Sequence, residues 1–163
     1  SIGNRAFLNC GFSSIKIPWS VESLGLNPFA GCMHLEVIDV SENPNFVFVD
    51  GVLMDKEMTQ IICCLCSKLG DYSIPNSVTK ICGNAFHGCD RLTSITIPDS
   101  VEEIGHEAFN YCSGLSSVVI PDSVTEIEGL AFDNCSSLKT VSVPERLTYS
   151  SSAFPDGATI NKR

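Results

Sequence analysis

Apolar residues recur along most of this chain in one long phrase rather than in scattered short runs. The phrase reads Ile-Pro-x-Ser-Val-x-x-Ile, then Ala-Phe-x-x-Cys-x-x-Leu, and it starts at Ile74, Ile97 and Ile120, so its period is 23 residues. Residues 97–119 and 120–142 are identical at 13 of 23 matched positions. A fixed period of roughly 20–50 residues is the sequence signature of a solenoid. The repeat therefore predicts the fold class before any local propensity is considered.

Each repeat contains one apolar strand pattern followed by turns. Leu92, Ile95 and Ile97 place apolar side chains on one side, and Pro98 ends the strand because it has no N–H for a ladder. We expect the Ala108-Phe109 pair to fill the core from a short helical turn. The prediction is a mainly β, right-handed repeat solenoid. It has a parallel sheet on one face, short strands and turns on the other, and a β-hairpin insert.

The same phrase divides the chain into coils within one expected repeat domain, 1–163. The expected parts are a partial coil 1–16, coils 17–39, 74–96, 97–119 and 120–142, an enlarged coil 40–73, and a degenerate cap 143–163. Because residues 1–16 match only the later part of a repeat, we expect the chain to be a fragment or a processed product.

The enlarged coil carries a hairpin signal. Asp50-Gly51 stands between the apolar runs 46–49 and 52–54, and Asp-Gly suits a type I′ turn, which needs positive φ at both central residues. A second pairing, of residues 51–55 with 60–64, is also open. A three-stranded meander would use both turns.

The repeated phrase resembles the BspA-type leucine-rich repeat family, most closely from Ile74 to Val143. The resemblance implies a curved, right-handed leucine-rich repeat fold, in a non-catalytic protein that is secreted or attached to the cell surface of a host-associated microbe. It also implies a role in adhesion or binding. The chain departs from the family pattern at Ile61-Ile62-Cys63-Cys64-Leu65-Cys66, which is rich in thiols, and in the decayed last coil.

Charge and hydropathy narrow the range of partners. The formal net charge is −9, which disfavours nucleic acid and anionic membrane surfaces because both attract basic proteins. No run of 18 apolar residues is present, so no direct membrane insertion is expected. We expect a protein or a glycan as the partner, for example one of the host extracellular matrix.

Nine cysteines suggest disulfides until their positions are compared. Five share one repeat position, and identical positions point their Cβ atoms the same way, which disfavours a disulfide dihedral near 90°. We therefore predict buried thiols at Cys10, Cys32, Cys89, Cys112 and Cys135.

Metal ligation and catalysis find little support in the sequence. The best metal candidates are Cys63, Cys64, Cys66, Cys82, His87 and Cys89. No paired C-x-x-C spacing is present, and strand alternation puts Cys63 opposite Cys64. His34, His87 and His106 are expected at exposed positions, away from any nucleophile. We predict no metal, no cofactor and no enzyme activity.

The outward residues of the strands are the best candidates for binding, because solenoids present extended surfaces to their partners. They are Lys16, Asp39, Ser94, Thr96, Ser117, Val119, Thr140 and Ser142. The aromatic residues Trp19, Phe46, Phe48 and Tyr72 are alternatives. Two further interpretations stay open: small hydroxyl residues also suit a tightly packed sheet, and the chain could be a structural spacer of a longer surface protein.

Overall fold

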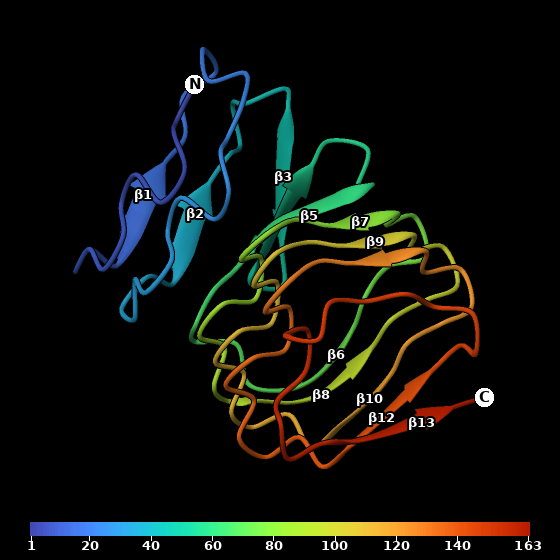
Figure 1. The fold of residues 1–163 in the computed structure, drawn as a ribbon. Helices are drawn as coiled ribbons and strands as arrows, with labels where there is room; N and C mark the ends of the chain where they lie inside the picture. Colours follow the sequence, from blue (N-terminus) through green and yellow to red (C-terminus); the bar gives the residue numbers. More distant parts are fainter.

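The computed structural model describes residues 1–163 as an all-β solenoid without helices (Figure 1), which confirms the predicted fold class. No segment therefore qualifies as a membrane-crossing helix. The strands are β1 Ser14–Lys16, β2 Val37–Asp39, β3 Phe46–Val49, β4 Val52–Asp55, β5 Gln60–Cys64, β6 Gly70–Ser73, β7 Lys80–Ile81, β8 Leu92–Thr96, β9 Glu103–Ile104, β10 Ser117–Val119, β11 Glu126–Ile127, β12 Thr140–Val143 and β13 Thr159–Lys162.

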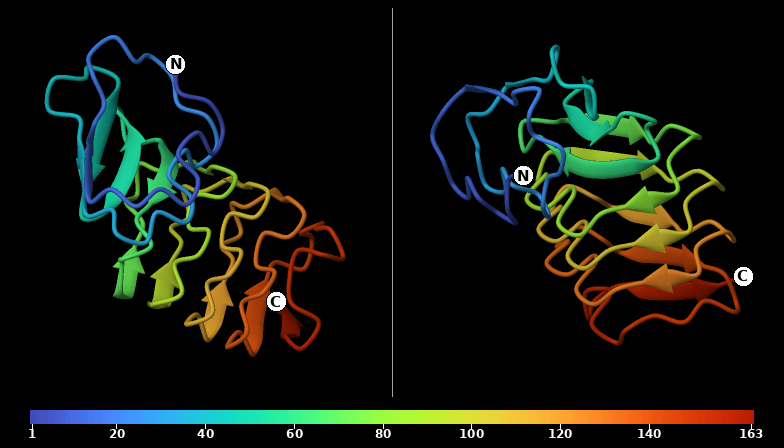
Figure 2. Two further views of the ribbon diagram at one scale, coloured as in Figure 1. Left: turned by 90° about the vertical axis from the view of Figure 1, so that its left-hand side faces the viewer. Right: turned by 90° about the horizontal axis from the view of Figure 1, so that it is seen from above.

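Two sets of strands line opposite sides of the coils (Figure 2). We call β1, β2, β6, β8, β10, β12 and β13 the front strands. The back sheet has the order β11-β9-β7-β5-β4-β3. Pairing is offset by one repeat, so that Ile127 pairs with Ile104 and Ile104 with Ile81. Side chains at one repeat position are consequently stacked on each other along the solenoid.

The clearest such stack is a column of phenylalanine rings. Phe86 and Phe109 have ring centroids 4.9 Å apart at 12°, and Phe109 and Phe132 are 4.8 Å apart at 8°. Phe154, which stands one residue early in its repeat, still joins the column at 5.3 Å from Phe132. Aromatic pairs of this kind contribute about 0.5–1.5 kcal/mol beyond the burial of their area.

The prediction of a helical turn around Ala108-Phe109 is wrong, because the structure has successive β-turns there. Glu107 and Tyr111 have φ values of 56° and 61°, and left-handed residues interrupt a right-handed helix. The backbone instead bonds to the next coil: the Phe109 N–H donates to the Ala131 carbonyl at 2.7 Å. Such bonds between coils alternate with turn bonds within the coil, such as the one from the Asn110 N–H to the Glu107 carbonyl at 3.1 Å.

The insert is a three-stranded antiparallel meander that uses both turns considered above. Val49 pairs with Val52 across Asp50 and Gly51, whose φ values are 51° and 77°. The second turn is closed by Asp55, whose carboxylate accepts the Thr59 N–H at 2.7 Å. Strand β5 then pairs in parallel with β7, so the insert extends the back sheet.

The meander separates two hydrophobic cores. Leu53 and Cys63 face an N-terminal core that includes Phe29 and Ile38, whereas Met54 faces the larger core of the regular coils. Apolar residues are required on both faces of these strands. This two-sided burial accounts for the unbroken apolar run at residues 61–66, all of which are buried.

The front strands do not form one continuous sheet. Strands β1 and β2 form one pair, β6 and β8 form a second, and β10, β12 and β13 form a third group (Figure 1). The insert accounts for the break between β2 and β6, since the chain leaves β2 for the back sheet before it returns to the front in β6. The N-terminal coils contact the later ones at a corner, where Arg5 donates hydrogen bonds to Asn84 and Glu107.

Candidate functional site

The repeated cysteines are structural thiols. All nine cysteines are free, and four of the five at the repeated position are buried while Cys10 is half-buried. The Cys112 Sγ donates to the Phe86 carbonyl at 3.1 Å, and the Cys135 Sγ donates to the Phe109 carbonyl at 3.1 Å. Burial raises the pKa of Cys112 well above its usual value and that of Cys135 to about 12. Such thiols carry little thiolate and are poor nucleophiles.

The metal candidates lie on different sides of the meander. Cys63 belongs to the N-terminal core, while Cys64 and Cys89 belong to the larger core. No group of three or more His, Cys, Asp or Glu side chains is arranged to hold a metal ion. Burial raises the pKa of Cys63 well above its usual value and that of Cys82 to about 11.

The repeat predicted that all three histidines are exposed. His34 and His106 are exposed, but His87 is half-buried. The His87 ring is half-buried and packs against the Tyr111 ring in an edge-type arrangement, at a centroid distance of 5.6 Å. Its Nδ1 is covered and has no hydrogen-bond partner. The left-handed turn places the His87 side chain against the next coil. Neither strand nor helix periodicity predicts that direction.

We expect His87 to make the fold less stable in mild acid. Desolvation lowers the pKa of His87, and Arg5 adds to this while Glu107 opposes it. As the pH falls, the unfolded chain binds the proton before the folded chain does. The stability that neutral His87 contributes is therefore fully present above the unfolded pKa of about 6.5, and it is lost as the pH falls through the lower folded pKa. Urea unfolding at pH 7.5 and 5.5 should show this loss, on the order of a few tenths of a kcal/mol because the ring is half-exposed.

The matched variant is His87→Asn, since Asn110 occupies the same position in the next repeat. This variant should have a smaller difference in unfolding free energy between the two pH values. An unchanged difference would mean that other groups cause the acid sensitivity.

All eight candidate binding residues lie on front strands, but they fall into two groups. Lys16 and Asp39 lie on β1 and β2, beyond the break in the front strands. The other six lie together on the outward side of β8, β10 and β12, which we call the hydroxyl face. The hydroxyl face consists of Ser94, Thr96, Ser117, Val119, Thr140 and Ser142.

The hydroxyl face is regular, and all of its residues are exposed except Ser142, which is half-buried. Ser117 pairs with Thr140 and Val119 with Ser142, so its residues follow the repeat across the strands. Val119 is 59% exposed and is the one large apolar residue of the face. A groove of about 360 Å³ crosses the face between β8 and β10, lined by Ser94, Thr96, Ser117 and Val119 together with Asp99 and Arg163.

Arg163 is a residue of this face that the sequence did not reveal. Strand β13 pairs with β12, which brings Arg163 back over the face. Its Nη1 donates to Asp122 at 2.8 Å and its Nε donates to the Ser142 hydroxyl at 3.0 Å. The tail lacks the repeat phrase, so no sequence signal gave its register.

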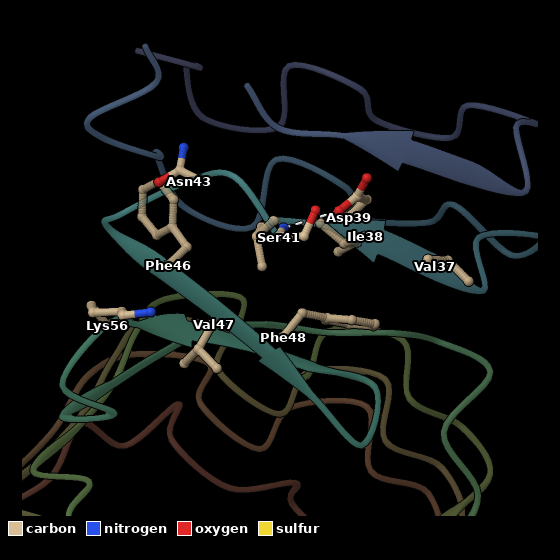
Figure 3. A pocket seen from close by; sticks show the side chains of 10 residues that line it. Val37, Ile38, Asp39, Ser41, Asn43, Phe46, Val47, Phe48 and Lys56 are labelled. Carbon is tan, nitrogen blue, oxygen red and sulfur yellow. Dashed lines mark hydrogen bonds between the residues drawn. The ribbon is translucent and has the colours of Figure 1, made fainter. Parts of the chain in front are cut away.

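A second hollow lies between β2 and β3, where the N-terminal coils diverge from the insert (Figure 3). We call it the β2–β3 cleft. Its volume is about 440 Å³, and its lining includes Val37, Ile38, Asp39, Val47, Phe48 and Lys56. Of the four aromatic alternatives, Phe46 and Tyr72 are buried, Phe48 is half-buried in this lining, and Trp19 is 70% exposed on a turn.

The family model described as BspA type leucine rich repeat region matches residues 1–48 and 56–162 in six copies. Among solved structures, the pneumococcal vaccine antigen PcpA is 28% identical with a TM-score of 0.84, covering 98% of this chain and 42% of its own. A leucine-rich cell surface protein from Faecalibacterium prausnitzii is 25% identical with a TM-score of 0.73, covering 98% and 50%. A leucine-rich repeat protein from Bacteroides capillosus is 26% identical with a TM-score of 0.65, covering 73% and 99%.

No curated protein matches the chain. The chain spans half or less of the length of PcpA and of the Faecalibacterium protein.

Proposed function

Because the chain belongs to the BspA-type leucine-rich repeat family, we propose that it is a non-catalytic binding module of a secreted or cell-surface protein. The module presents its hydroxyl face to a protein or glycan partner, such as a component of a host extracellular matrix. The description of the Faecalibacterium protein as a cell surface protein supports the proposed location. Buried, weakly acidic thiols and the absence of a grouped set of ligands support a role without chemistry.

The observation that carries this proposal is the repetition of hydroxyl side chains at matched repeat positions of β8, β10 and β12, with β10 and β12 paired in register. Hydroxyl groups donate and accept hydrogen bonds, which suits the polar groups of a sugar or a peptide backbone. Asp99 and the Arg163–Asp122 ion pair add charges of both signs beside the same groove. The face therefore offers polar recognition over an extended area, as solenoid surfaces commonly do.

We would test the face by binding to extracellular-matrix proteins and a glycan array. The quadruple variant Ser94→Glu, Thr96→Glu, Ser117→Glu and Thr140→Glu adds four carboxylates to the hydroxyl face. The matched control places four glutamates at exposed serines elsewhere, at Ser20, Ser67, Ser136 and Ser151, so that the net charge is the same. We expect binding to be lost in the first variant and kept in the control, with equal thermal stability.

Either of two outcomes would contradict the proposal. Equal binding by both variants would move the contact to another surface, and no binding by the original chain would favour a structural spacer.

A further inference from the structure

The β2–β3 cleft occupies the place of a missing front strand. In the regular coils each front strand is followed, one repeat later, by another that lies beside it, as β12 lies beside β10. Strand β2 has no such neighbour, because it pairs only with β1 and the chain continues into β3. Strands β2 and β3 diverge from the loop 40–45, with Ser41 and Asn43 at the narrow end and Val37 and Phe48 toward the open end (Figure 3).

The free edge of β2 carries unpaired backbone groups. The Val37 N–H donates to the Ser13 carbonyl at 3.3 Å, and the Asp39 carbonyl accepts the Ile17 N–H at 2.9 Å. Backbone groups of successive residues point to opposite edges of a strand. The N–H and C=O of Ile38 therefore point away from β1 toward the cleft that Ile38 lines.

Strand β3 presents a second free edge. The Lys56 N–H donates to the Asn45 carbonyl at 2.9 Å, so the groups of alternate residues, including Val47, point toward β4. Those of Phe46 and Phe48 point the other way, and β3 is the last strand of its sheet. An unpaired sheet edge is a template for a further strand from another chain.

We propose that the β2–β3 cleft binds an extended peptide segment of a partner protein, which adds as a strand to the free edge of β2. The unpaired groups of Ile38 bond to the backbone of the segment, as in β-strand addition. Val37 and Phe48 contact its apolar side chains, and Val37 is 49% exposed without such a contact. Asp39 and Lys56, one on each wall, favour a segment whose exposed side chains include both charge signs. This site is separate from the hydroxyl face and does not depend on it.

The probe is an array of seven-residue peptides in which Val, Ile, Phe or Tyr alternates with Thr, Ser, Lys or Glu. We expect members of the array to bind, and their copies with N-methyl groups at alternate residues, which lose the N–H donors, not to bind. In solution, the best peptide should slow hydrogen exchange of the Ile38 amide at least about tenfold, because the amide becomes paired.

Two variants locate the contact. Val37→Arg should weaken peptide binding about tenfold, the effect of losing part of one buried valine. Val49→Arg changes an equally exposed valine that is outside the cleft lining, and it should bind as the original chain does. The quadruple glutamate variant of the hydroxyl face should also keep peptide binding, which separates this test from the previous one.

Three results would overturn the proposal. The first is that no peptide of the array binds at about 1 mM, a concentration that corresponds to a binding free energy of about −4 kcal/mol. The second is equal binding by the N-methylated copies. The third is a concentration-dependent dimer, measured by sedimentation, that Val37→Arg abolishes, since it would assign the cleft to a second copy of this chain.

Discussion

Replacing Phe109 with alanine should cost about 3–5 kcal/mol of unfolding free energy, the usual range for a buried phenylalanine. Phe109 is fully buried and is stacked between the rings of Phe86 and Phe132 at 4.9 Å and 4.8 Å. Its loss leaves a cavity inside the column and removes two ring contacts at once. Each coil is stabilised mainly by its neighbours, so the loss affects the coils on both sides. Urea unfolding followed by circular dichroism would measure it.

The matched control is Trp19→Ala, which also removes a large aromatic ring but from a side chain that is 70% exposed. It should change the unfolding free energy by no more than about 0.5 kcal/mol. A loss of less than about 1 kcal/mol of unfolding free energy for Phe109→Ala would contradict the stacked column, because removing a ring that is packed between two buried rings should cost more than this.

The regular coils could be predicted from the sequence in some detail. The repeat assigned inward positions to Ile104, Ala108, Phe109 and Cys112, and all four are fully buried. A strict period allows this because every coil is placed by the one before it. Local conformation within the coil was harder, since the left-handed residue Glu107 is not a glycine and gave no sequence signal.

The N-terminal half departs from the expected regularity for a non-local reason. The run at residues 61–66 was interpreted as an unusual, thiol-rich departure, but its strand is buried on both faces between two cores. A short apolar run of this kind is typical of a fully buried strand. The length and composition of the run therefore did indicate a strand that is buried on both faces. The corner contact of Arg5 with Asn84 and Glu107 joins residues far apart in the chain and has no local pattern.

The candidate site was predictable in part. Strand alternation correctly placed Ser94, Thr96 and Ser117 outward, because a period of two fixes which side a residue faces. It did not show that the break in the front strands separates Lys16 and Asp39 from the others. The break and the β2–β3 cleft both follow from the path of the insert into the back sheet.

Leu53→Ala and Met54→Ala should each cost about 2–5 kcal/mol but should loosen opposite halves of the molecule. The two residues are adjacent in β4 and almost fully buried, at 0% and 1% exposure. Leu53 contributes to the N-terminal core and Met54 to the core of the regular coils. Native-state hydrogen exchange should therefore show faster exchange in β1 and β2 for the first variant, and in β7 and β9 for the second.

Each variant serves as the control for the other, because both remove a buried side chain of similar size from the same strand. If the two variants accelerated exchange equally throughout the chain, the meander would not separate two cores, and the molecule would unfold as one unit. A divided response would mean that the N-terminal coils can loosen while the hydroxyl face stays folded.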